Sequence, residues 1–238
     1  MIALTIPLFV FIGLLPSVAW LIFYIREDLR HPLPMKFILL AFILGGIMTF
    51  LVLPIQLALN KQLPLIGVET YSLISFLILG GVEEFFKFAA VYFFIHKRRA
   101  FDEPLHAMIY MITAALGFAA VENVASVFQA ADSSLFNIAI LEALVLRFVG
   151  ATLLHSLTSG LVGYYWGLNF IKQGRSFVLH HERELRPLIK GLIIASLLHA
   201  VFNWLIIETG PATFAIVFLV FTAFFILNDF EKFKREDI

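Results

Sequence analysis

Ionisable side chains interrupt one long apolar stretch of this chain. Glu83, Glu84 and Lys87 lie in the middle of the run from Tyr71 to Ile95, which can cross a bilayer because about 20 apolar residues suffice. A charge near the bilayer centre costs about 2.5 to 3.5 kcal/mol on insertion scales. The three groups are therefore expected to face protein, water or an ion. Lys87 lies one helical turn from both carboxylates and offsets part of their repulsion.

Three further apolar stretches each carry isolated polar groups. Glu122 lies in one, His155 in the next, and His199 in a third. Each histidine has a polar residue four positions later, Ser159 and Asn203 respectively, and this spacing places both members of a pair on one helix face. Asn203 is expected to hold the tautomer of His199, as a hydrogen-bond partner does for a ligand or a base.

Carboxylates beside imidazoles indicate the activation of water. In a metal-dependent version, His155 and His199 with Glu122 form a site of two histidines and one carboxylate that binds zinc and leaves a position open. A carboxylate of the pair Glu83 and Glu84 then deprotonates the bound water. Cysteine is absent from the chain, so thiolate chemistry and disulfides are excluded.

A metal-free version uses the same groups. A glutamate whose pKa is raised by burial and by a neighbouring carboxylate takes a proton from water directly. A histidine and Asn203 then stabilise the oxyanion. The residues alone do not distinguish the two versions, and both make Glu83, Glu84, Glu122, His155, His199 and Asn203 the expected site.

These groups require membrane helices to position them. The 238 residues are 61% hydrophobic and 14% charged, a composition typical of an all-α polytopic membrane protein that forms a single transmembrane domain over residues 1–238. Acidic and basic residues balance at 17 each, so the charge indicates no nucleic-acid partner. Apolar windows predict seven spans, which are Leu4–Ile25, Phe37–Leu59, Tyr71–Ile95, Leu105–Phe128, Phe148–Ile171, Pro187–Ile207 and Thr213–Leu227.

The basic residues predict the orientation of this bundle. Loops between spans and the C-terminal tail that would share one side hold fourteen Lys and Arg residues, whereas the opposite loops hold only Lys61 and Arg147. Cytoplasmic loops carry the excess of positive charge, so we expect the N-terminus outside and the C-terminus in the cytoplasm. The segment Leu135–Arg147 is interpreted as an interfacial helix or an extension of the fifth span; an eighth, short span would overturn this topology.

The remaining histidines are interpreted differently. They lie in basic loops or at the cytoplasmic end of a helix, where a solvated side chain is the expected state. These residues are His31, His96, His106, His180 and His181.

The motifs, taken in order, carry a family resemblance. Glu83-Glu84-Phe85-Phe86-Lys87 is followed by Phe118-x-x-x-Glu122, His155-x-x-x-Ser159 and His199-x-x-x-Asn203. With these four motifs on successive helices the chain resembles the PrsW family of intramembrane proteases, which is distantly related to the CAAX prenyl endopeptidases. The CAAX group has a histidine where this chain has Glu122, so the PrsW branch fits better.

The resemblance implies an integral membrane endopeptidase of a bacterial cell membrane. It implies cleavage of single-pass membrane proteins near their extracytoplasmic side, such as an anti-sigma factor at the first step of a stress response. It also implies that the activity depends on Glu83, Glu84, Glu122, His155 and His199, while the metal requirement, the individual substrate and the oligomeric state stay open.

Two other classes of function use similar residues. A proton- or cation-coupled transporter places carboxylates and histidines in a relay, but the chain has neither paired discontinuous helices nor the repeat symmetry of many transporters. A non-enzymatic membrane scaffold would use the buried acids for stability alone. Interhelical hydrogen bonds average about 0.6 kcal/mol, which is too little to explain three carboxylates, a lysine and two histidines at matched depth.

Overall fold

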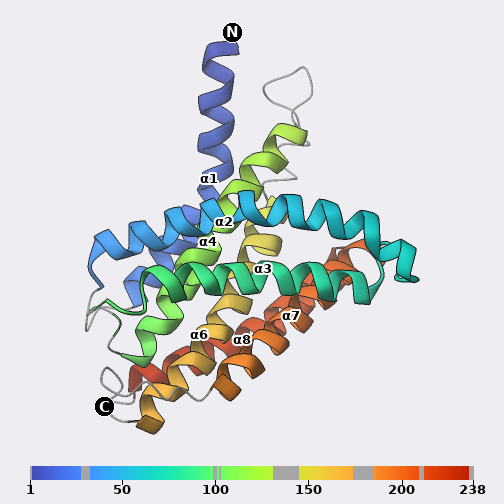
Figure 1. Ribbon diagram of the computed structural model, residues 1–238. Helices are drawn as coiled ribbons and strands as arrows, with labels where there is room; N and C mark the ends of the chain where they lie inside the picture. Colours follow the sequence, from blue (N-terminus) through green and yellow to red (C-terminus); the bar gives the residue numbers. More distant parts are fainter. Residues whose placement is uncertain are drawn as a thin grey trace.

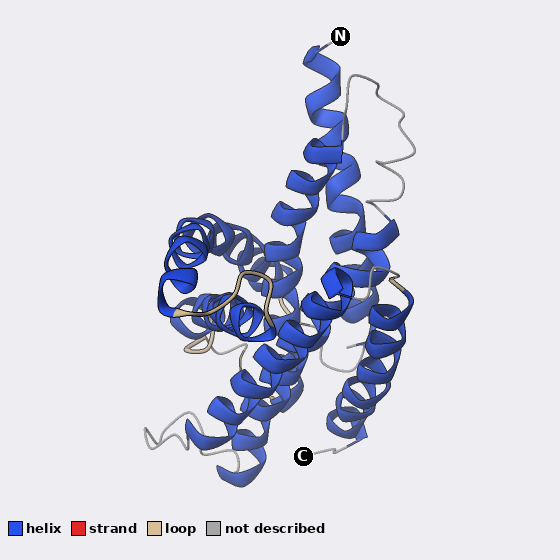
Figure 2. Ribbon diagram, turned by 90° about the vertical axis from the view of Figure 1, so that its right-hand side faces the viewer, coloured by secondary structure: helices blue, strands red, loops and turns tan. Residues whose placement is uncertain are grey.

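The apolar stretches of the sequence form long helices. The computed structural model describes residues 2–27, 33–98, 101, 103–130, 145–173, 185–208 and 212–235, and within these residues the regular structure is helical, as Figure 2 shows. The seven long helices are α1 (Ile2–Glu27), α2 (Met35–Gln62), α3 (Leu73–Phe94), α4 (Pro104–Ala130), α6 (Thr152–Gln173), α7 (Leu185–Glu208) and α8 (Thr213–Arg235).

These helices confirm the polytopic all-α architecture. Five of them, α1, α2, α4, α7 and α8, are long and apolar enough to cross a membrane by length and composition. The other two, α3 and α6, carry many of the buried polar groups described below. The last helix, α8, continues to Arg235, past the expected end at Leu227, and its last two turns carry charged residues.

The helix α4 forms the centre of the bundle. Every residue from Leu105 to Ala120 is buried, and α4 packs against α1, α2, α3, α6 and α8. A helix that is apolar all round needs this degree of coverage. In Figure 1, α2 and α3 lie side by side, at a steep angle to α1. The helix α3, which carries Glu83 and Glu84, thus packs beside α2.

Small residues allow α2 to approach α4 closely. A Cβ atom on Gly45 would lie 1.8 Å from the carbonyl oxygen of Ala114, and one on Gly117 would lie 1.9 Å from that of Phe42. Only glycine fits at both crossing points, as at other close contacts between membrane helices. This contact fixes the rotation of α2 about its axis and thereby the direction in which its polar side chains point.

Local signals set the ends of α3. The preceding 3₁₀ turn Leu63–Ile66 ends at Gly67, whose φ of 83° is in the left-handed region that glycine adopts without strain. Ser72 then caps α3, because its hydroxyl oxygen accepts a hydrogen bond from the Ser75 amide at 3.2 Å, the arrangement preferred at helix N-termini.

A π-helical turn, Arg147–Ala151, leads directly into α6. Such turns occur frequently at functional sites. The indole of Trp20 on α1 donates to the Phe148 carbonyl at 3.0 Å, so a backbone acceptor in the turn is satisfied by a neighbouring helix. Of the segment Leu135–Arg147, residues 135–144 lie outside the described part of the chain.

Two of the histidines expected to be solvated are buried. His96 is 6% and His106 is 5% exposed, and the His96 ring stacks on Tyr92, with ring centroids 4.4 Å apart, and lies near Trp166 of α6. The expectation was wrong for His96 because the connection after α3 packs back onto Trp166 of α6. It was wrong for His106 because the first turn of α4 is itself buried. His31, His180 and His181 lie outside the described residues.

Candidate active site

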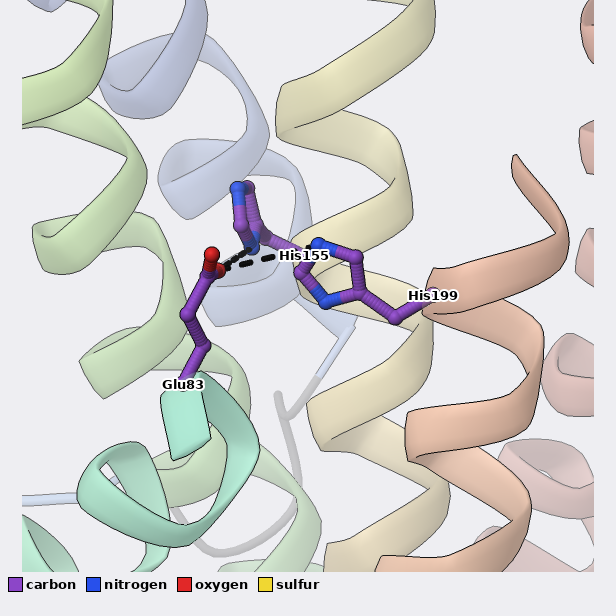
Figure 3. A group of neighbouring side chains, drawn as sticks. All are labelled: Glu83, His155 and His199. Carbon is purple, nitrogen blue, oxygen red and sulfur yellow. Dashed lines mark ion pairs between the residues drawn. The ribbon is translucent and has the colours of Figure 1, made fainter. Parts of the chain in front are cut away.

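Side chains from three helices converge below the surface of the bundle. Glu83 of α3, His155 of α6 and His199 of α7 point toward one another (Figure 3). One ligand atom of each lies within 4.8 Å of the others, and all three side chains are buried. Residues far apart in the chain thus form one compact group.

The carboxylate of Glu83 is only half satisfied. Its Oε1 accepts a hydrogen bond from Gln56 Nε2 at 2.8 Å. Its Oε2 is buried and receives no hydrogen bond from the described residues. This oxygen lies 3.6 Å from His199 Nε2 and 3.9 Å from His155 Nδ1. A buried carboxylate oxygen without a hydrogen-bond donor destabilises the fold. Its position beside two imidazole nitrogens therefore points to a ligand that would bind all three atoms.

Glu84, the next residue, is fully satisfied. Its Oε1 accepts from Lys87 Nζ at 2.8 Å, Thr158 Oγ1 at 3.0 Å and His199 Nδ1 at 3.2 Å. Its Oε2 accepts from Ser159 Oγ at 2.9 Å. The two neighbouring carboxylates therefore differ. Glu84 binds α3 to α6 and α7, whereas Glu83 Oε2 has only an ion-pair contact with Lys87 Nζ at 3.6 Å and accepts no hydrogen bond from the described residues.

Glu122 of α4 contacts the far side of His155. Its Oε2 lies 2.9 Å from His155 Nε2 and 3.5 Å from Arg147 Nη2. Because a carboxylate only accepts, His155 Nε2 donates this hydrogen bond. Glu122 thus orients His155 from outside the group that contains Glu83, whereas the site expected from the sequence placed it beside both histidines.

The arrangement can hold a metal ion. Zinc ligands at 2.0 to 2.1 Å in a tetrahedron lie about 3.3 Å apart, only a few tenths of an ångström less than the separations of Glu83 Oε2 from the two imidazole nitrogens. The outer nitrogens of His155 and His199 each face a carboxylate, the arrangement that orients metal-bound histidines. Glu83 Oε2, His155 Nδ1 and His199 Nε2 are therefore the atoms that could hold a metal ion.

Asn203 forms no hydrogen bond with the imidazole of His199 among the described residues. Both nitrogens of His199 face glutamate oxygens, while Asn203 lines a neighbouring cavity of about 380 Å³. Arg147 and Phe202 also line this cavity, and its walls are otherwise mostly apolar residues of the π-helical turn, α7 and the start of α8. The cavity is linked to the site through Arg147, which contacts Glu122.

Two residues of the site, Gln56 and Arg147, were not predicted from the sequence. Gln56 donates to Glu83, and as a lone amide in the apolar run from Phe37 to Leu59 it carried a detectable signal. Arg147 was noted only as a basic residue of an outer segment, and its contact with Glu122 depends on how α4 and α6 pack.

Comparisons with known proteins agree with this geometry. The model of the family described as PrsW family intramembrane metalloprotease matches residues 33–228, a range that includes every residue of the site. The chain is 28% identical over 197 residues to Protease PrsW of Geobacillus kaustophilus, covering 82% of this chain and 78% of the relative.

Two other relatives are matched over nearly their whole length. The chain is 24% identical to Protease PrsW of Oceanobacillus iheyensis over 94% of this chain and 93% of the relative. It is 24% identical to Protease PrsW of Bacillus subtilis over 92% and 93%. No solved structure matches the chain. The chain belongs to the PrsW family of intramembrane metalloproteases and is a membrane-embedded protease.

Proposed function

We propose that this chain hydrolyses a peptide bond of membrane-anchored proteins at a zinc centre held by Glu83, His155 and His199. The observation that carries the proposal is the free Oε2 of Glu83, buried without a hydrogen bond and facing two imidazole nitrogens. Zinc held by these three residues would supply a coordinated water with a pKa of about 7, and so a hydroxide at neutral pH.

The surrounding residues orient this centre. Glu122 accepts from His155 Nε2 and Glu84 accepts from His199 Nδ1, which makes His155 Nδ1 and His199 Nε2 the acceptor nitrogens that would bind the ion. Of these two nitrogens, His155 Nδ1 has Lys87 Nζ 2.6 Å away. Gln56 holds the other oxygen of Glu83. In this assignment Glu122 positions His155 and is not itself a ligand.

The cavity beside the site is where we propose that the substrate binds. Its mostly apolar walls suit the apolar side chains at the end of a transmembrane substrate segment. Ligand pockets in proteins likewise combine apolar walls with a few polar groups. The Asn203 amide and the Arg147 guanidinium are the polar groups on this wall. We assign Asn203 to hydrogen-bond the carbonyl oxygen under attack, where a donor stabilises the developing negative charge.

The side of cleavage follows from the topology that we propose. The start of α1 and the end of α8 lie at opposite ends of the molecule (Figures 1 and 2), which supports an odd number of crossings. With the basic loops in the cytoplasm, Glu122, His155 and His199 lie in the outer half of the bilayer. A bacterial plasma membrane and a single-pass substrate cut near its extracytoplasmic side, such as an anti-sigma factor, fit this placement.

Cleavage of a tagged single-pass membrane protein in proteoliposomes tests the proposal. We expect Glu83→Gln and His199→Ala to abolish cleavage, whereas the exposed Glu69→Gln serves as the matched control and cleaves normally. A chelator should stop cleavage by the native chain, and zinc should restore it. Undiminished cleavage in chelator would favour direct activation of water by Glu83 and refute the metal centre.

A further inference from the structure

The ammonium of Lys87 lies inside the group that we assign to the metal. Its Nζ is 2.6 Å from His155 Nδ1, 2.8 Å from Glu84 Oε1 and 3.6 Å from Glu83 Oε2. The side chain is completely buried, and Nζ lies 4.8 Å from the centre of the Phe118 ring. A cation of the protein itself thus contacts two of the three proposed ligands.

The contact with His155 decides which nitrogen carries the proton. An ammonium only donates hydrogen bonds, so Nδ1 accepts from Lys87. Nε2 donates to Glu122 Oε2 at 2.9 Å. The ring is therefore a neutral imidazole whose one free lone pair, on Nδ1, points at Lys87. That lone pair is also the one that a metal ion at this centre would use.

We infer that Lys87 and the metal ion compete for the lone pair of His155 Nδ1, so that Lys87 must withdraw from His155 before the metal binds. Lys87 is then a positioning residue that keeps the site assembled without metal. When it leaves His155, its flexible stem allows it to stay paired with Glu84, which it already contacts at 2.8 Å. The inference rests on the proposed metal-dependent function and adds a control on metal loading.

The charges of the site favour the same conclusion. The carboxylates of Glu83, Glu84 and Glu122 face the two cations Lys87 and Arg147. Removal of one partner from a buried ion pair leaves an uncompensated charge, so without Lys87 the pair Glu83 and Glu84 would lack its cationic partner. A divalent ion can replace it. Loss of Lys87 should therefore strengthen metal binding and make the fold depend on metal.

Zinc binding to purified protein measures the competition directly. The native chain, Lys87→Met and Lys87→Gln are stripped with chelator in detergent, and zinc affinity is determined by competition with a chromophoric chelator. Lys61→Met is the matched control, because Lys61 is exposed at the end of α2. The thermal unfolding midpoint of each protein is recorded with chelator and with zinc.

We expect both Lys87 variants to bind zinc roughly tenfold to a hundredfold more tightly than the native chain, the range for loss of one competing charge-assisted hydrogen bond. Their unfolding midpoints should fall in chelator and recover with zinc, while Lys61→Met behaves as the native chain. Equal or weaker zinc binding by the Lys87 variants would overturn the competition, as would variants that stay unfolded in zinc. If neither the native chain nor any variant binds zinc, the proposed metal centre fails as well.

Discussion

The adjacent residues Glu84 and Glu83 should respond differently to the same substitution. Glu84 accepts hydrogen bonds from four donors, whereas Oε2 of Glu83 accepts none from the described residues. In Glu84→Gln the amide oxygen can keep the position of Oε1, and the amide nitrogen can face Ser159 Oγ, which is able to accept. The shape is preserved but the negative charge beside Lys87 is lost. Removing one partner of a buried ion pair costs about 3 to 5 kcal/mol, so we expect a large loss of stability.

The substitution Glu83→Gln should have little effect on stability but should abolish cleavage. Its amide oxygen can still accept from Gln56, and its amide nitrogen takes the place of Oε2, which has no hydrogen bond among the described residues to lose. Lys87 lies farther from this carboxylate, at 3.6 Å. We expect a change of about 1 kcal/mol or less in stability, together with complete loss of cleavage because the free oxygen is gone.

Unfolding in sodium dodecyl sulfate, followed by the fluorescence of the three tryptophans, measures stability for both variants. Cleavage of a tagged single-pass protein is measured on the same preparations. Ser159→Ala calibrates the scale, because it removes one neutral donor from Glu84 and should cost about 1 to 3 kcal/mol. The reasoning is refuted if Glu83→Gln destabilises the protein as much as Glu84→Gln, or if Glu83→Gln retains cleavage.

Three further predictions concern the scaffold. Gly45→Ala places a Cβ 1.8 Å from the Ala114 carbonyl oxygen and should destabilise the protein by about 1 to 3 kcal/mol or more. Gly46→Ala should be tolerated, because the nearest atom to its Cβ lies at 3.4 Å. Thermal unfolding of the two variants checks this, and equal midpoints would contradict the packing argument. Tyr24→Phe removes a buried hydroxyl 3.2 Å from Ser156 Oγ and should cost about 1 kcal/mol in the same assay; an unchanged midpoint would argue against that bond. Alkaline phosphatase fused to the C-terminus should be inactive in cells, since the basic tail is expected in the cytoplasm, and an active fusion would reverse the topology.

The sequence by itself determined where the membrane helices lie and which of them carry ionisable groups. The length of an apolar run and the cost of a charge in a bilayer are properties of the local sequence. The predicted spans accordingly match the seven long helices to within a few residues at most ends. The exception is α8, where the charged turns after Leu227 continue the helix because Phe230 and Phe233 remain buried.

Only the tertiary structure decided which of these groups face one another. Successive residues on a helix point about 100° apart, so a small rotation decides whether Glu83 or Glu84 keeps a free oxygen. The rotation of α3 is set by its packing against other helices, such as the approach of Gly80 to His199 of α7, whose Cγ would lie 3.1 Å from a Cβ at position 80. The sequence of α3 alone does not contain this information. The same packing places Glu122 outside the histidine pair, Asn203 on the cavity wall and the ammonium of Lys87 against His155.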